Sequence, residues 1–167
     1  MEIVAGPEFE RSGGVLTLSF ADRRRSRLRT RLDDGREIAL HLPRGTALRD
    51  GDRLRSEAGE LVIAVRAAAE SLSRVGSDDT LRLARAAYHL GNRHVPVQIG
   101  PGFLAYEHDH VLDGMIEDLG LRPVAASAPF EPEAGGYRHG GARAHDHGHH
   151  HEHDHGEHDH GEHGHGH

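Results

Sequence analysis

The chain has 167 residues, of which 20 are basic and 27 acidic, for a formal net charge of −7; all 20 basic residues are arginine. It contains no cysteine, which excludes disulfides, thiolate nucleophiles and cysteine-ligated zinc or iron–sulfur sites. Six of the acidic residues fall in residues 144–167. The rest of the chain is therefore close to neutral, which argues against a nucleic-acid-binding surface.

The first residues, Met1 to Pro7, lack a basic segment followed by an apolar run, and no apolar stretch reaches membrane-spanning length. We therefore expect a cytoplasmic protein without a membrane partner.

Residues 1–66 carry the alternating apolar pattern of β-strands. Residues 15–20 are a β-prone run, and apolar residues between Leu28 and Leu42 alternate on either side of the turn-like Asp33-Asp34-Gly35. Residues 43–51 are expected to form a loop, and residues 61–65 another strand. This spacing predicts a small all-β domain.

Beyond residue 67 the apolar period changes to that of helices. Ser77-Asp78-Asp79 supplies an N-cap, and Gly91 is a natural stop for the helix between them. A second helix over residues 111–119 ends before Gly120. The apolar positions expected on the first helix are Leu81, Leu83, Ala84, Ala87, Tyr88 and Leu90.

Strands are expected near residues 71–75, 96–99, 103–106 and 124–126, which gives the order βαββαβ of the ferredoxin-like pattern. We predict an α+β chain with an all-β domain over residues 1–68 and a ferredoxin-like domain over residues 69–130. A disordered His-rich tail follows over residues 131–167. Folded domains of about 65 residues are marginally stable alone, which favours a dimer.

Two short motifs in the second domain carry histidines. His94 ends the sequence Tyr88-His89-Leu90-Gly91-Asn92-Arg93-His94 just before Pro96, so it is either a metal ligand on a fixed scaffold or a surface histidine favoured by the helix dipole. His108-Asp109-His110 precedes the second helix. It is either a chelating pair or an Asp109 N-cap flanked by two exposed histidines.

The segment from residue 145 to residue 167 contains only histidine, acidic residues and glycine. Such a segment buries too little apolar surface to fold, whereas its imidazoles are suited to nickel, copper or zinc. The alternative is a pH-responsive solubility tail. The expected ligands are His145, His147, His149, His150, His151, His153, His155, His158, His160, His163, His165 and His167.

The arginine run Arg23, Arg24, Arg25, Arg27, Arg29 and Arg31 is expected to form the solvated outer face of a strand. The alternative is a docking surface for an acidic partner or for the chain's own acidic tail.

The motif from Tyr88 to His94 with Pro96, together with Val111-Leu112, Met115 and Leu119-Gly120, resembles the UreE family of urease accessory proteins, which are nickel metallochaperones. The resemblance covers residues 1–130 and is most specific over residues 78–120. It implies an N-terminal domain that engages partners or peptides and a ferredoxin-like, metal-binding domain that dimerises.

For single residues, the resemblance implies that His94 lies at the dimer interface, where two subunits share one nickel ion. It makes His108 and His110 a further metal-binding pair and His89 a subsidiary ligand. Imidazole binds metal only when neutral, so we expect binding to weaken below about pH 6.5. Copper(II) or zinc(II) could replace nickel(II) in vitro, because nitrogen ligands do not select nickel by affinity.

The function predicted from the resemblance is non-enzymatic delivery of nickel to the urease accessory GTPase and the urease apoprotein complex. One alternative is a metal storage or buffering protein whose function lies in the tail. A second is a metal-dependent hydrolase, which is disfavoured because the sequence has no His-Glu-x-x-His motif.

Overall fold

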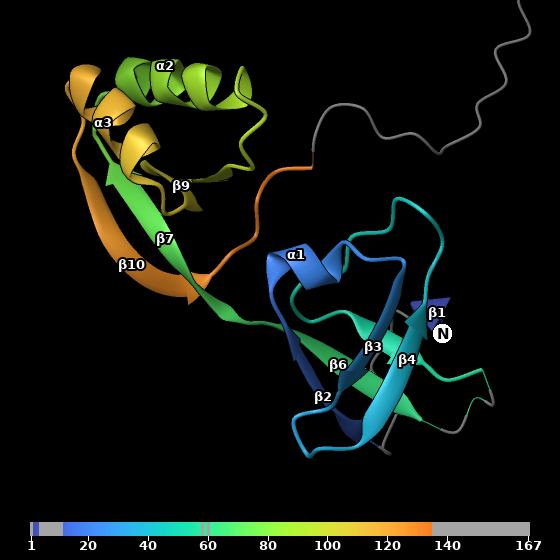
Figure 1. The fold of residues 1–167 in the computed structure, drawn as a ribbon. Helices are drawn as coiled ribbons and strands as arrows, with labels where there is room; N and C mark the ends of the chain where they lie inside the picture. The colour runs from blue at the N-terminus through green and yellow to red at the C-terminus, as the bar shows by residue number, and fades with distance from the viewer. Residues whose placement is uncertain (1, 4–11, 58, 60, 135–167) are drawn as a thin grey trace, which may run out of the picture.

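The computed structural model describes residues 2–3, 12–57, 59 and 61–134, which form two successive halves of the chain (Figure 1). The predicted tail ligands, His145 to His167, lie outside these residues. Strands dominate the first half and helices accompany the sheet of the second half, so the predicted α+β class is confirmed.

The N-terminal half contains two sheets and one short helix within the described residues. A four-stranded sheet has the order β1-β5-β6-β2, and β3 and β4 form a separate antiparallel hairpin. The pair β2–β6 is parallel. The elements are β1 (Glu2–Ile3), β2 (Ser12–Leu18), α1 (Phe20–Arg23), β3 (Arg27–Arg31), β4 (Glu37–His41), β5 (Arg53–Arg55) and β6 (Val62–Ala67).

Helix α1 corrects the expectation that residue 20 continues a strand. The Ser19 side chain accepts a hydrogen bond from the backbone N–H of Asp22, so a serine N-cap starts a helix where the apolar pattern suggests strand. Phe20 then packs with its ring edge-to-face on Phe130, the two ring centroids lying 5.5 Å apart.

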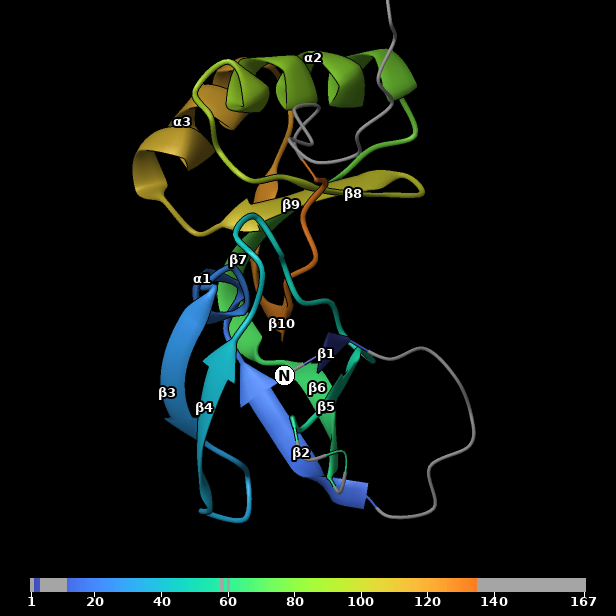
Figure 2. The ribbon, with the colours of Figure 1, turned by 90° about the vertical axis from the view of Figure 1, so that its right-hand side faces the viewer.

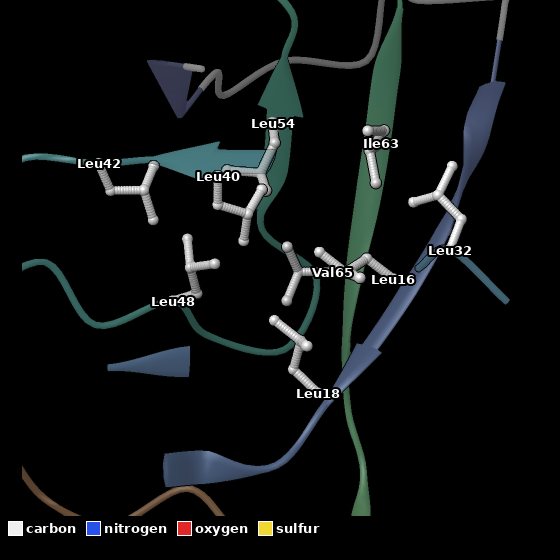
Figure 3. Close-up of a cluster of buried hydrophobic side chains, with 9 residues drawn as sticks. All are labelled: Leu16, Leu18, Leu32, Leu40, Leu42, Leu48, Leu54, Ile63 and Val65. Atoms are coloured by element: carbon white, nitrogen blue, oxygen red, sulfur yellow. The ribbon is translucent and has the colours of Figure 1, made fainter. Parts of the chain in front are cut away.

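The core of this half is built almost wholly from leucine (Figure 3). Its members come from β2, β4, β5, β6 and the connecting loops, and their alternation along the strands places every second side chain inside. The buried residues are Leu16, Leu18, Leu32, Leu40, Leu42, Leu48, Leu54, Ile63 and Val65.

The C-terminal half runs strand, helix, strand, strand, helix, strand. Its sheet has the order β10-β7-β9-β8 with all neighbours antiparallel, and both helices cover the same face of it (Figures 1 and 2). The elements are β7 (Ala69–Gly76), α2 (Thr80–Gly91), β8 (Gln98–Gly100), β9 (Phe103–Glu107), α3 (His110–Asp118) and β10 (Pro123–Pro129).

Helix α2 buries a narrower face than its apolar residues suggest. Leu83, Ala86 and Leu90 face the sheet, whereas Leu81 and Tyr88 are 59% and 66% exposed. Positions 81 and 88 lie seven residues apart, so they share one side of the helix, turned away from the core. Helical spacing therefore predicts the helix correctly but does not show which of its apolar residues enter the core.

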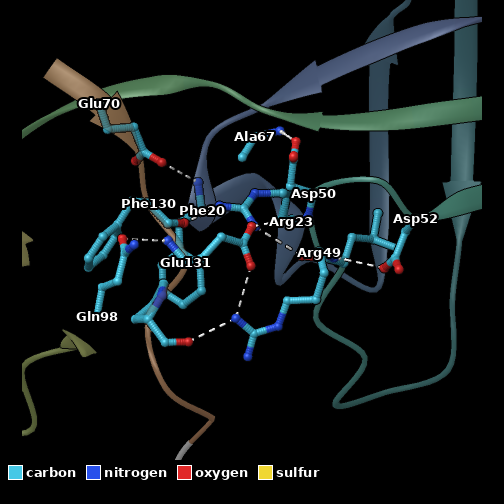
Figure 4. Close-up of polar contacts among 12 residues, drawn as sticks. Phe20, Arg23, Arg49, Asp50, Asp52, Ala67, Glu70, Gln98, Phe130 and Glu131 are labelled. Carbon is cyan, nitrogen blue, oxygen red and sulfur yellow. Dashed lines mark hydrogen bonds and ion pairs between the residues drawn. The ribbon is translucent and has the colours of Figure 1, made fainter. Parts of the chain in front are cut away.

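A buried arginine joins the two halves (Figure 4). Arg23 is fully buried, and its guanidinium donates to the carbonyl oxygens of Leu48 and Phe130 and pairs with the carboxylate of Glu131. Arg49 Nη1 also lies 3.0 Å from Glu131 Oε2. The segment that follows β10 is thereby fixed against the N-terminal half.

The arginine run is thus divided between two environments. Arg23 lies in α1 and is buried, which corrects the expectation that it belongs to a solvated strand face. Arg27, Arg29 and Arg31 alternate along the exposed side of β3, as expected, and Arg31 pairs with Glu37 of β4.

Replacing Glu131 by alanine leaves the buried charge of Arg23 without its carboxylate, so we expect the free energy of unfolding to fall by about 3 kcal/mol. The matched control is Glu37→Ala, which breaks the pair with Arg31. Those two side chains are 67% and 75% exposed, and the expected loss is below about 0.5 kcal/mol. Urea denaturation followed by circular dichroism measures both values. Equal losses of unfolding free energy in the two variants would show that the buried Arg23–Glu131 pair stabilises the fold no more than the exposed Arg31–Glu37 pair.

Candidate functional site

His94 lies just beyond α2, in the turn that closes the helix. Its backbone N–H donates to the carbonyl of Gly91, and the N–H of Val95 donates to the carbonyl of Leu90. These two bonds satisfy carbonyls that the helix end leaves unpaired, as in a Schellman motif. The side chain of His94 is exposed on this fixed turn.

The backbone of His94 is in the left-handed region, with φ of +57°. Among the described residues no other non-glycine residue has a positive φ. Helices usually place glycine at this point because a side chain is strained there. The sequence points to Gly91 as the helix stop, and α2 does end at Gly91, but the left-handed residue is His94.

His89 lies in the last turn of α2 and is half-buried. Its ring stands edge-to-face against Tyr88, with centroids 5.4 Å apart, and its carbonyl accepts a hydrogen bond from Arg93. His89 and His94 therefore belong to the same helix end, although no hydrogen bond joins their side chains within the described chain.

His108 and His110 flank the start of α3. Asp109 is the N-cap of this helix and accepts hydrogen bonds from the backbone N–H groups of Leu112 and Val111, which hold the pKa of its carboxyl below the ordinary value. Both histidines are exposed. The N-cap interpretation of Asp109 is confirmed, whereas metal binding by the two histidines stays a prediction.

The two histidines differ in their surroundings. His108 Nδ1 lies 2.9 Å from Ser73 Oγ and 3.2 Å from Asp113 Oδ2. The ring of His110 makes no hydrogen bond within the described residues. The sequence pattern does not single out Ser73 or Asp113, which lie on β7 and in the first turn of α3. The acid in the first turn was the only available signal, and it is also an ordinary helix-stabilising feature.

Tyr106 supports this arrangement from β9. It is fully buried, and its hydroxyl donates a hydrogen bond of 2.7 Å to Asp113 Oδ1. Burial raises the pKa of Tyr106 well above its ordinary value, the hydrogen bond to Asp113 raises it further, and a hydrogen bond from Ser73 lowers it. Tyr106 is therefore a neutral donor over the physiological pH range.

The described residues bring no three histidine or acidic side chains into an arrangement that could hold a metal ion. His94 stands at one helix end, and His108 and His110 at the start of another. His145 to His167 belong to the residues that are not described.

Two family models match the chain. The N-terminal domain of the UreE urease accessory protein matches residues 11–68, and its C-terminal domain matches residues 70–167. Within the described residues, no helix is long and apolar enough to cross a membrane.

Curated relatives give the same result. The chain is 56% identical over 131 residues to the urease accessory protein UreE of Alkalilimnicola ehrlichii, an alignment that covers 78% of this chain and 80% of that protein. It is 58% identical over 125 residues to UreE of Pseudomonas putida strain W619, covering 75% and 78%. UreE of Cupriavidus necator is 52% identical over 143 residues, covering 86% and 72%.

The strain at His94 can be measured. Glycine adopts a positive φ without a steric penalty, so we expect His94→Gly to raise the free energy of unfolding by about 0.5–1 kcal/mol. The control is Asn92→Gly, because Asn92 has φ of −63°, where glycine relieves nothing and should not stabilise. Urea denaturation of both variants tests this. A destabilised His94→Gly variant would mean that the imidazole makes compensating contacts.

Proposed function

This chain belongs to the UreE family of urease accessory proteins, and we propose that it binds nickel(II) and delivers it to the urease maturation complex. The family consists of accessory proteins that serve urease maturation and not of enzymes, which confirms the prediction of a non-enzymatic role.

The observation that carries the proposal is the position of His94. An exposed imidazole is held on a rigid helix end, in a backbone conformation that favours glycine, and no other metal-binding group of the described chain completes its shell. Backbone strain of this kind is concentrated at functional sites. His94 is held in a fixed position but does not complete a coordination shell alone. Such a ligand suits a protein that must bind an ion and then release it.

We propose that a second copy of the chain supplies the missing ligand. A twofold axis near the end of α2 would present His94 twice to one ion. The exposed Leu81 and Tyr88 support this, because they form an apolar stripe on the same helix that leads to His94. A homodimer would bury this stripe and join the two imidazoles.

In this proposal His108 and His110 form a second site away from the twofold axis, His89 is a subsidiary ligand, and the twelve histidines of residues 145–167 collect ions loosely. Copper(II) and zinc(II) would occupy the same nitrogen sites in vitro. The C-terminal half would be a ferredoxin-like, metal-binding domain over residues 69–130. The βαββαβ succession and the strand order β10-β7-β9-β8 support that assignment.

The N-terminal half, residues 1–68, would be the partner-binding domain, and residues 131–167 a disordered tail. We propose that the protein works in the cytoplasm and hands its nickel to the urease accessory GTPase and the urease apoprotein complex. No nucleic acid or membrane takes part in this scheme.

A storage or buffering role is the second candidate. It is favoured by the histidine count, because twelve of the 18 histidines of the chain lie in residues 145–167. Under this alternative the tail would hold nearly all bound metal and the folded part would only anchor it.

Nickel titration of a variant that lacks residues 139–167 separates the two functions. A carrier should retain about one tightly bound ion per dimer, because His94 lies outside the deletion, whereas a buffering protein should lose nearly all binding. Isothermal titration calorimetry gives the stoichiometry, and analytical ultracentrifugation gives the oligomeric state.

The shared ligand is tested by adding His94→Ala to the shortened protein. We expect the tight ion to be lost while the dimer and the circular dichroism spectrum are kept. His41→Ala, which removes an exposed histidine from β4 of the other half, is the matched control and should bind nickel as before. Unchanged binding by the His94→Ala variant would rule out the shared site.

A further inference from the structure

We propose that Ser73, Asp113 and Tyr106 are positioning residues that fix the ring of His108 so that its Nε2 atom is presented to the metal ion. This inference rests on the proposed function, in which His108 is a ligand. The inference adds which ring nitrogen of His108 binds the metal ion, and it names the three side chains that determine this choice.

The first step concerns the proton on His108 Nδ1. This atom faces Asp113 Oδ2 at 3.2 Å and Ser73 Oγ at 2.9 Å. An ionised carboxylate can only accept hydrogen bonds, and a hydroxyl can accept as well as donate. Both neighbours are therefore satisfied together when Nδ1 carries the hydrogen. In the neutral imidazole this leaves the lone pair on Nε2.

The second step concerns the orientation of Asp113. Tyr106 Oη lies 2.7 Å from Asp113 Oδ1, and its hydroxyl donates to that atom, so the other oxygen is left to face His108. Tyr106 is fully buried and the Asp113 side chain is 21% exposed, so water competes little for these bonds. The carboxylate is thus held as an acceptor at a fixed place.

The third step concerns the elements that carry the group. Ser73 is fully buried on β7, Tyr106 comes from β9 and Asp113 from α3. The backbone N–H of His108 also donates to the carbonyl of Ser71, at 3.0 Å. Main chain and ring are therefore both tied to the sheet, while the His108 side chain stays 47% exposed.

This arrangement has the form of a metal-binding histidine with its supporting carboxylate. A ligating imidazole usually donates its other N–H to a carboxylate or carbonyl, which fixes the tautomer and makes the ligating nitrogen more basic. Loss of such a partner typically weakens metal binding 10- to 100-fold. His110 has no comparable support within the described chain, so the two histidines of this segment are not equivalent.

Nuclear magnetic resonance on the full-length protein with ¹⁵N-labelled histidine tests the tautomer without any metal. The ¹⁵N shifts of each imidazole ring, recorded at about pH 8, show which of its two nitrogens carries the hydrogen. The His108→Ala variant identifies the His108 signals by their loss. We expect the Nδ1–H form in the wild-type protein and a shift towards the Nε2–H form in Asp113→Asn, whose amide can donate to Nδ1.

Nickel sulfate titration of the same samples tests the consequence, because bound paramagnetic nickel removes the His108 ring signals. We expect Asp113→Asn to need about tenfold more nickel for half loss of these signals. Ser73→Ala is a second, less disruptive variant, and it should also raise the amount of nickel needed for half loss of these signals. Glu117→Gln makes the same charge change on an exposed position of α3 and should behave as the wild type.

The outcomes separate this inference from the proposed function. If His108→Ala leaves nickel binding at the segment unchanged, judged by the His110 ring signals, the ligand role fails and the positioning role fails with it. If His108→Ala weakens binding but Asp113→Asn and Ser73→Ala do not, only the positioning role is overturned. An Nε2–H tautomer in the wild-type protein overturns it as well.

Discussion

The arrangement of the two halves depends on one buried charge. The guanidinium of Arg23 has no access to water, so its hydrogen bonds must be made within the protein. The carbonyls of Leu48 and Phe130 and the carboxylate of Glu131 accept hydrogen bonds from its two terminal nitrogens, whereas its Nε has no partner within the described residues. Two of these partners follow β10, at the far end of the C-terminal sheet, and Arg23 itself comes from α1. Satisfying this charge therefore requires that the last strand of one half lie against the first helix of the other.

Much of the fold could be predicted because its signals are local. Alternating leucines predicted the strands of the first half, and an aspartate N-cap with a glycine stop predicted α2, whose cap is Asp79 and whose last residue is Gly91. The errors come from tertiary contacts. No residue near Arg23 in the sequence indicates that Arg23 pairs with Glu131, which lies 108 residues later. Leu81 and Tyr88 carry helical periodicity, but the sheet covers only one side of α2.

The candidate site, like the fold, could be predicted from the sequence only where its signals are local. Composition and motif identified His89, His94, His108 and His110, and the family membership agrees with the motif. The strained backbone of His94 could not be foreseen, because glycine at position 91 is the residue that usually takes the left-handed conformation. The support of His108 by Ser73 joins residues 35 positions apart, and spacing along the chain carries no signal for such a contact.

The connection between the halves has a thermodynamic consequence. Ala68 alone separates β6 from β7, and the chain crosses back at Phe130 and Glu131. Because the two halves are joined both at Ala68 and through Phe130 and Glu131, one half cannot rotate relative to the other unless the Arg23–Glu131 salt bridge opens. The orientational entropy of the two halves is thus lost during folding and not during complex formation. A partner protein that contacts both halves therefore binds a surface whose two parts already have a fixed relative orientation. Binding then carries no entropic cost for orienting one half against the other.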